Sequence, residues 1–206
     1  MIGGRDVNRG NLTGPRGNLG MKVSREQMAE NRRRILDAAS RLFREKGFDA
    51  VSVAEVMKAA GLTHGGFYGH FRSKDDLIEH ALTHVLAGST GGEDLRTYVD
   101  AYLSPRHRDD AGGGCPTASL AAAARHQTPG VRSAMAEGLR RRVDHIGKSL
   151  PEADPAERRR AAIGIWAAMV GAVILARAID DPALSDEVLD GTRAWIDGGV
   201  KRMAGA

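Results

Sequence analysis

The chain has 206 residues, 42% of them hydrophobic and 27% charged, which is ordinary for a globular protein and leaves room for one large domain or two small ones. A single cysteine excludes an intramolecular disulfide framework, and no apolar run follows the first basic residues as in a secretory signal, so we expect a cytoplasmic protein. The formal net charge of +4 is unevenly placed: residues 1–87 hold 14 Lys and Arg against 10 Asp and Glu, whereas residues 88–206 hold 16 of each.

Residues 1–23 are predicted to form a disordered arm. Six glycines fall within residues 1–20, and no hydrophobic periodicity runs through them. The first helix is expected to begin at Ser24, whose hydroxyl can accept a hydrogen bond from the helix start, and to end at Gly47. Its apolar residues recur at helical spacing and form one stripe.

The stretch from Ser52 to Leu77 carries the start and stop signals of three short helices. Ser52 with Glu55, and Ser73 with Asp76, are capping-box pairs, in which each side chain accepts from one free N–H group of the helix start. Two helices are therefore predicted to begin at these serines, with a third between them.

The turn after the first of these helices contains Gly61, which tolerates a positive φ. Thr63 is expected to cap the next helix, where Phe67 and Phe71 lie four residues apart and face the core. Two helices joined by a tight glycine-containing turn, the second one short and flanked by His, Tyr and Lys, are typical of a helix-turn-helix, which places its second helix in the DNA major groove.

Beyond residue 87 the sequence predicts more helices and no strand. The expected helices span residues 94–103, 116–125, 128–150, 154–179 and 185–203, and the polar, glycine-rich residues 106–114 are expected to form a mobile loop. The apolar run 161–176 is short for a membrane span and suits a buried helix, so no membrane partner is expected. The predicted fold class is all-α, with a three-helix DNA-binding domain over residues 24–72 and a second helical domain over residues 73–206.

The segment FREKGFDAVSVAEVMKAAGLTHGGFYGHFRSKDDL resembles the tetracycline-repressor (TetR/AcrR) family. The matching positions are Phe43, Gly47, Ser52, Val56, Ala60, Gly61, Phe67, Tyr68, His70, Phe71, Ser73 and Lys74. The resemblance implies an all-α homodimer whose N-terminal domain binds double-stranded DNA. It also implies a C-terminal domain that holds a ligand and dimerises through its last two long helices.

Nine residues are expected to meet the DNA. The exposed start of the recognition helix, where side chains reach base edges, holds Thr63, His64, Gly65 and Gly66. Tyr68 resembles the family tyrosine that hydrogen-bonds a phosphate. The remaining candidates, for the backbone or the groove edge, are Arg33, Ser52, His70 and Lys74. For each of them a purely structural role, as a helix cap or a solvated side chain, stays open.

Cys115 is predicted to lie at the start of a helix, where the helix dipole favours a thiolate. Its surroundings resemble a Gly-Cys-Pro segment of some family members, a few of which sense electrophiles. The alternative, a small buried apolar side chain, stays open. Tyr98, Tyr102, Trp166 and Met169 can line an apolar ligand cavity with Cys115, or they can be ordinary core.

The helices near 155–179 and 185–203 are expected to pair with their symmetry mates into a four-helix interface. The small residues expected to allow close approach are Ala161, Gly164, Ala168 and Ala172, and the apolar contacts are expected from Ile165, Met169, Trp195 and Ile196.

The predicted function is a ligand-responsive transcriptional regulator, most often a repressor in this family, that binds a palindromic operator as a homodimer. The effector is an unknown small molecule, and no cofactor, metal or enzymatic activity is expected. One alternative is an electrophile- or redox-sensing repressor acting through Cys115. The other, from a different class, is a small helical enzyme or metal-binding protein, for which His80 and His84 on one helix are the candidate pair.

Overall fold

The computed structural model describes residues 24–88 and 94–205, and within these ranges the chain is helical and contains no strand. The predicted disordered arm, residues 1–23, lies outside the described residues. The elements are α1 (Arg25–Ala50), α2 (Val53–Ala59), the 3-10 helix η1 (His64–Gly69), α3 (Lys74–Ala87), α4 (Leu95–Tyr102), α5 (Pro105–Asp109), α6 (Pro116–Ala124), α7 (Pro129–Lys148), α8 (Pro155–Ala178) and α9 (Pro182–Ala204). The predicted all-α fold class is confirmed.

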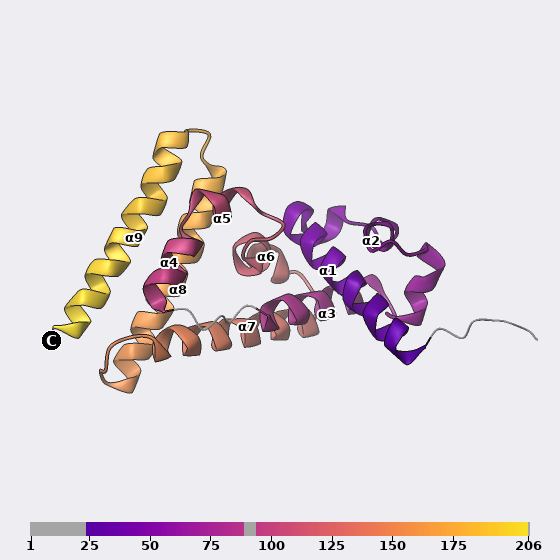
Figure 1. The fold of residues 1–206 in the computed structure, drawn as a ribbon, viewed down its shortest axis with the longest axis horizontal. Helices are drawn as coiled ribbons and strands as arrows, with labels where there is room; N and C mark the ends of the chain where they lie inside the picture. Colours follow the sequence, from indigo (N-terminus) through magenta and orange to yellow (C-terminus); the bar gives the residue numbers. More distant parts are fainter. Residues whose placement is uncertain (1–23, 89–93, 206) are drawn as a thin grey trace, which may run out of the picture.

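Figure 1 shows α1, α2 and η1 at one end of the molecule and the long helices α8 and α9 at the other. Helix α7 connects the two ends, with α3 packed along it and α6 between α1 and α8. By length and composition alone α8 is apolar enough to cross a membrane, a test that core helices of globular proteins also pass. It packs against α7 and α9, but Ile163, Ile174 and Leu175 stay exposed, so the predicted burial of this helix is only partial.

Two hydrophobic clusters form the interior. The first contains Phe67 and Phe71, which were predicted to face the core, together with Ile35, Phe43 and Phe48, all at most 2% exposed. Side chains of α6 and α7 also belong to it, so the helix-turn-helix packs directly on helices of the C-terminal part. The second cluster lies among α4, α7, α8 and α9.

The predicted serine caps are present. The hydroxyls of Ser24, Ser52 and Ser73 each accept from the backbone N–H three residues later, at 3.1 Å. The return contact predicted for Glu55 is not formed, because its carboxylate binds Nζ of Lys46 at 2.6 Å. The helix start is therefore held by the serine, while the glutamate ties α2 to α1.

Residues 106–114 were expected to form a mobile loop, and this is wrong for their first part. Residues Pro105–Asp109 form α5, and the Ser104 hydroxyl caps it by accepting from the His107 N–H at 3.2 Å. The Ser-Pro pair marks a helix start here, because proline needs no N–H partner at the first helical position.

The last helix begins earlier than expected. It starts at Pro182 and is capped by Asp181, rather than starting at Ser185. The Ser185 side chain is buried, and its hydroxyl donates to the carbonyl of Ala176 at 2.8 Å. This serine joins α9 to α8 instead of capping α9.

Gly47 interrupts the helical geometry at the predicted place, although the helix assignment continues to Ala50. Its φ of 80° and ψ of 170° belong to a region that is essentially restricted to glycine. The bend allows Phe48 to turn back into the core beside Phe43, with the ring centroids 5.5 Å apart.

We therefore predict that Gly47→Ala lowers the free energy of unfolding by about 1–3 kcal/mol, because alanine is strained at this φ and ψ. Urea unfolding followed by circular dichroism measures it. Gly65→Ala is the control, since Gly65 has ordinary φ and open space around the added Cβ. Equal stability of the two variants would contradict the assignment of strain to Gly47.

Candidate DNA-binding surface and C-terminal cleft

The helix-turn-helix consists of α2, a turn at Gly61 and η1. Gly61 has a φ of 67°, as its predicted role in the turn requires. The recognition element is a 3-10 helix rather than an α-helix, consistent with the weak helix propensity of Gly65 and Gly66 near its start. Thr63 holds the predicted N-cap position in extended geometry, but its side chain makes no capping hydrogen bond. Its exposed hydroxyl is left available to an external partner.

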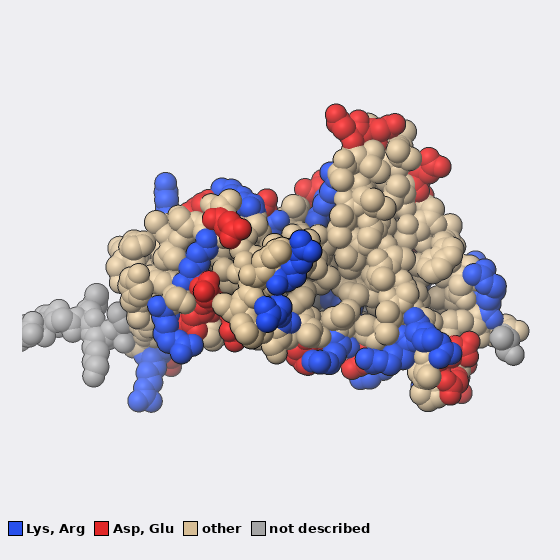
Figure 2. Space-filling view, turned by 180° about the vertical axis from the view of Figure 1, so that it is seen from behind, with Lys and Arg blue, Asp and Glu red and all other residues tan. Residues whose placement is uncertain are grey.

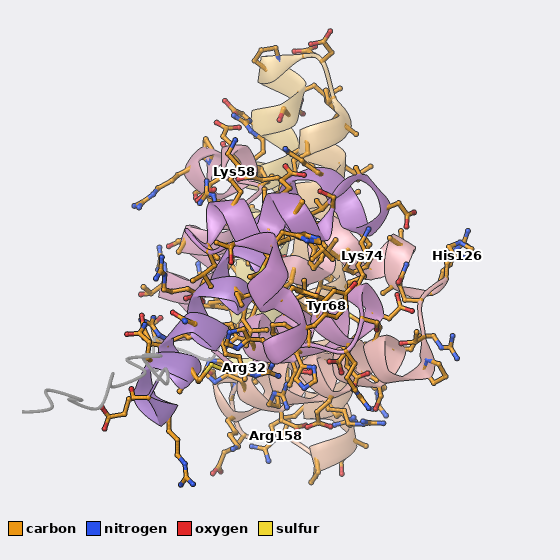
Figure 3. All side chains as sticks on the ribbon, turned by 90° about the vertical axis from the view of Figure 1, so that its right-hand side faces the viewer. Arg32, Lys58, Tyr68, Lys74, His126 and Arg158 are labelled. Atoms are coloured by element: carbon orange, nitrogen blue, oxygen red, sulfur yellow. The ribbon has the colours of Figure 1, made fainter. Side chains whose placement is uncertain are left out.

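The two faces of η1 differ strongly in their exposure to solvent. Phe67 and Phe71 are buried and stacked with centroids 5.8 Å apart, whereas the Tyr68 side chain is 73% exposed. Thr63, His64, Gly65 and Gly66 are also exposed. Figure 3 looks onto this side of the domain and shows Tyr68 near its centre. The inner face of η1 therefore anchors the element, and the outer face is free for contact.

Three further candidates lie around η1. Lys74 begins α3, and its Nζ makes only a long contact of 3.4 Å with the carbonyl of Asp49, which leaves donors for another partner. Ser52 is exposed, although its hydroxyl already caps α2. Partial burial, and then the nearby charge of Arg32, lower the pKa of His70, so its imidazole is neutral at pH 7.

Arg33, a predicted DNA contact, is held by ion pairs within its own helix. It lies exposed on α1 in ion pairs with Glu30 at 2.8 Å and Asp37 at 3.6 Å. Arg32 instead stacks on the ring of Phe71 at 4.2 Å and donates to the carbonyl of His70 at 2.7 Å. Arg32 lies three residues before the buried Ile35, at the edge of the apolar stripe, a signal that could have distinguished it from Arg33.

Lys58, in the last turn of α2, was not predicted as a contact residue. It is exposed and lies on the same side of the domain as Tyr68, Lys74 and Arg32 in Figure 3. Figure 2 shows that Lys and Arg also extend along the C-terminal part, while acidic side chains gather at the top of that view. Basic charge alone therefore does not single out the helix-turn-helix; the exposed outer face of η1 does.

A second candidate site is a cleft of about 280 Å³ in the C-terminal part. Four of the five predicted ligand residues line it, namely Tyr98, Tyr102, Cys115 and Trp166. Met169 does not; it is fully buried in the second hydrophobic cluster. Two lining residues, His107 and Arg142, were not predicted. His107 belongs to α5, a helix that was not predicted, and Arg142 lies on the buried side of α7.

His107 fixes the loop before α6. Its Nδ1 donates to the carbonyl of Tyr102 at 2.7 Å, which leaves Nε2 to accept from the N–H of Cys115 at 3.0 Å. The second bond requires the neutral imidazole, because a protonated Nε2 cannot accept. Burial lowers the pKa of His107, and the charge of Arg177 acts in the same direction, while the Tyr102 carbonyl and Asp110 oppose them.

Cys115 itself is 7% exposed and occupies the N-cap position of α6 without a capping hydrogen bond from its side chain. Burial raises the pKa of Tyr98 and of Tyr102, so both phenols stay protonated. The Tyr102 hydroxyl is buried close to the Cys115 side chain, which also helps to raise its pKa, and it makes no hydrogen bond of good geometry with a described residue.

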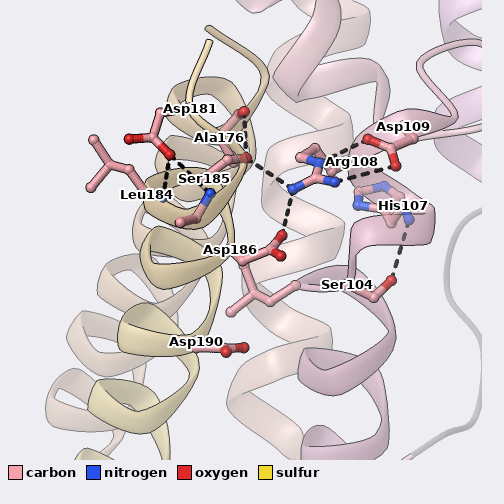
Figure 4. Close-up of polar contacts among 12 residues, drawn as sticks. Ser104, His107, Arg108, Asp109, Ala176, Asp181, Leu184, Ser185, Asp186 and Asp190 are labelled. Carbon is pink, nitrogen blue, oxygen red and sulfur yellow. Dashed lines mark hydrogen bonds and ion pairs between the residues drawn. The ribbon is translucent and has the colours of Figure 1, made fainter. Parts of the chain in front are cut away.

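Helix α5 is tied to α8 and α9 by charged side chains. Arg108 donates to the hydroxyl of Ser185 at 2.9 Å and to the carboxylate of Asp186 at 2.6 Å, as Figure 4 shows. Arg177 of α8 donates to the carbonyls of His107 at 3.0 Å and Arg108 at 2.8 Å. These bonds hold His107 in place at the edge of the cleft.

Among residues 24–88 and 94–205 there is no cluster of three or more potential metal ligands. His80 contacts the carbonyl of Asp76 at 2.7 Å, and His84 contacts the carboxylate of Asp37 at 2.7 Å. The two histidines thus have separate partners and do not point to a shared ion.

The stability of the protein is predicted to fall as the pH drops below about 6.5, partly through His107. The unfolded chain takes up a proton at the ordinary histidine pKa, whereas the folded chain resists because its pKa is lowered. His107→Gln should therefore reduce the loss of unfolding free energy between pH 7 and pH 5.5. The exposed His126 provides the control: His126→Gln should keep the wild-type pH dependence, and equal profiles for both variants would contradict the role of His107.

Comparison with known proteins covers both parts of the chain. Residues 35–81 match the family described as bacterial regulatory proteins, tetR family, and residues 91–192 match the tetracyclin repressor-like C-terminal domain. The HTH-type transcriptional regulator AcrR of Shigella flexneri is 44% identical over 57 residues, 28% of this chain and 26% of that protein. The HTH-type transcriptional repressor Rv1474c of Mycobacterium tuberculosis is 45% identical over 57 residues, 28% of this chain and 30% of that protein.

These relatives are matched over less than a third of their own length. The similarity to solved structures covers more of the chain. The reduced form of NemR from E. coli has a TM-score of 0.67 at 22% identity, over 82% of this chain and 96% of that one. A TetR-family regulator from Cytophaga hutchinsonii has a TM-score of 0.66 at 21% identity, over 84% and 96%. The two matched domains together span most of the chain, which belongs to the TetR family of bacterial transcriptional regulators.

Proposed function

We propose that this protein is a ligand-responsive repressor that binds a palindromic DNA operator as a homodimer. The observation that carries the proposal is the two-sided geometry of η1, with Phe67 and Phe71 buried and Thr63, His64 and Tyr68 exposed. A short helix anchored in this way can enter a major groove without losing its core contacts. A repressor role is supported by the name of the mycobacterial relative, which is called a transcriptional repressor.

In this proposal the base edges are read by Thr63 and His64, at the start of η1. Tyr68, Lys74 and Ser52 contact phosphates, and His70 lies at the groove edge. The exposed backbone at Gly65 and Gly66 allows close approach to the DNA. Lys58 and Arg32, on the same side of the domain, are proposed as further contacts to the DNA backbone. They are preferred to Arg33, whose charge is already paired within α1.

Dimerisation through α8 and α9 is supported by apolar side chains left exposed on these helices. Ile163 and Ile174 of α8 are 47% and 44% exposed, and Leu184 and Trp195 of α9 are 45% and 59% exposed. Each pair is separated by eleven residues, about three turns, and so lies on one face of its helix. An apolar face of this kind on two adjacent helices suits an isologous four-helix interface.

The residues predicted for that interface need revision. Ile165, Met169, Ala172 and Ile196 are at most 6% exposed and belong to the core of the subunit itself. Trp195 keeps its predicted role. Gly164 keeps its role too, since its Cβ position is open.

In the proposed regulation, one loop connects the cleft directly to the DNA-binding domain. The loop from Asp110 to Gly114 joins α5 to Cys115, and Nε of Arg44 in α1 donates to the Gly112 carbonyl of this loop. Arg41 of α1 lies 3.9 Å from the carboxylate of Asp110. A ligand that moves the loop would therefore move α1 and with it the recognition element.

The alternative form of regulation, reaction of Cys115 with an electrophile or oxidant, is supported by the position of the thiol in the cleft wall. The Cys115→Ser variant separates the two: a covalent sensor loses its response to quinones or aldehydes, whereas a noncovalent one keeps its response to a bound ligand. The enzyme alternative has no comparable observation in its favour.

DNA binding predicts distinct effects for phosphate and base contacts. Lys74→Ala should weaken binding to all duplexes and reduce the slope of log affinity against log salt by about 1, whereas Thr63 and His64 variants should relax base preference. Fluorescence anisotropy with the DNA upstream of the gene measures both effects.

Lys148→Ala is the matched control, because Lys148 is exposed at the far end of α7 from the helix-turn-helix. It should bind like wild type. If a Tyr68→Phe, Lys74→Ala double variant also retained full affinity for its own promoter, the assignment of this surface would be wrong.

The proposed dimer predicts that Trp195→Glu gives monomers at micromolar concentration, since a carboxylate would have to be buried in the interface. Sedimentation velocity measures the assembly state, and circular dichroism checks that the helices persist. Leu139→Glu is the control, because Leu139 is 45% exposed on α7 rather than on α8 or α9. A wild-type monomer, or a Trp195→Glu dimer, would exclude this interface.

A further inference from the structure

A buried arginine without an anionic partner lies in the wall of the C-terminal cleft. Arg142 is 8% exposed, and its Nη1 has no hydrogen-bond partner within the described ranges. Arginine remains charged in proteins, and an unpaired buried charge is costly. A charge kept at this depth calls for an explanation by a partner that binds there.

Among the described residues, no carboxylate pairs with Arg142. None of the residues lining the cleft is an Asp or Glu. On α7 itself, Glu137 pairs with Arg140 and Arg141, and Asp144 pairs with Arg159 at 3.1 Å. The nearby acidic side chains of the helix are thus already engaged by other arginines.

Aromatic rings hold the guanidinium in position. Its Cζ lies 5.0 Å from the ring centroid of Tyr98 and 5.2 Å from that of Trp166. Ring faces attract a cation but do not accept its N–H donors as an oxyanion does. The hydrogen-bonding capacity of Arg142 therefore remains available in the cleft.

A second unpaired group lies in the same wall. Tyr102 is 6% exposed, and its buried hydroxyl lies close to the Cys115 side chain but makes no hydrogen bond of good geometry in the described part of the chain. Its ring lies 6.0 Å from that of Tyr98 and 5.4 Å from that of Trp166, centroid to centroid. The cleft thus combines a cation, a neutral hydroxyl donor and flat apolar walls.

We propose that this cleft binds a small organic carboxylate with a flat or apolar body. The guanidinium of Arg142 and the hydroxyl of Tyr102 hold the carboxylate group of the ligand. The planar guanidinium matches a carboxylate. One fixed positive charge in the lining suits a monoanion, since His107 is neutral there. The volume of about 280 Å³ suits a compact molecule. This inference rests on the proposed effector role of the cleft and specifies the chemical class of the effector.

Isothermal titration calorimetry of the full chain with benzoate and with benzamide, its neutral analogue of the same shape, tests the proposal. Cyclohexanecarboxylate and trans-cinnamate vary the apolar body. Wild type is expected to bind at least one of these carboxylates, with an affinity at least tenfold above that for the matching amide. Equal affinity for acid and amide, or no binding of any carboxylate up to about 5 mM, would overturn the proposal.

Arg142→Gln should remove the preference for the acid over the amide, and Tyr102→Phe should weaken acid binding while leaving part of the preference. Arg140→Gln is the matched control: it removes the same charge from an exposed position on the same helix and should keep the wild-type preference. If Arg142→Gln retains the preference, Arg142 is not the anion partner. The wild-type comparison requires no variant, so failure of Arg142→Gln to fold does not block the test.

The assay contains no DNA, so failure to bind carboxylates leaves operator binding unaffected and is distinguishable from failure of the proposed regulator role. Unfolding of the ligand-free protein adds a second readout. Arg142→Met should be at least as stable as wild type, since it removes an unpaired buried charge. A large loss of stability would assign Arg142 to the packing of the core instead.

Discussion

The C-terminal cleft depends on the contacts of one guanidinium, that of Arg177. It donates to the carbonyls of His107 and Arg108 at the end of α5 and, at 3.2 Å, to the hydroxyl of Ser119 in α6. Helices α5, α6 and α8 are thereby joined at one point. With α5 fixed, His107 faces the N–H of Cys115 and completes the wall of the cleft.

The same arrangement connects the cleft to the DNA-binding domain. The loop that follows α5 is bonded to Arg44 of α1, and α6 packs against α1 within the hydrophobic cluster that holds Phe67. A ligand that binds the cleft better in one position of this loop shifts the balance toward that position by its difference in affinity. For a hundredfold loss of operator affinity, this difference must reach about 2.7 kcal/mol.

Much of the fold could be predicted from local signals. Serine caps and helix-ending glycines act within a few residues, which explains why the starts of α1, α2 and α3 were correct. The starts of α5 and α9 were missed because the proline after a capping side chain was read as a helix end or passed over. Helix α8 is apolar on nearly all sides, so its sequence does not tell which face is internal, and Met169 and Ile165 were assigned to the wrong one.

The two candidate sites also differ in how far they could be predicted from the sequence. The exposed residues of η1 follow from a local pattern, since Phe67 and Phe71 define the buried face and leave Tyr68 outside. The cleft requires α4, α5, α7 and α8 to meet, so Arg142 reads as an ordinary charged residue until Tyr98 and Trp166 are placed beside it. The contact residues at both sites remain predictions.

In the proposed regulation, occupation of the cleft lowers the affinity of η1 for DNA. The most direct measurement is the dissociation constant for the DNA upstream of the gene, with and without a saturating carboxylate that calorimetry has shown to bind. In wild type the affinity is expected to decrease at least tenfold, whereas Arg142→Gln is expected not to respond. Sequence-specific binding that stays unchanged when the cleft is saturated would contradict the proposed regulation.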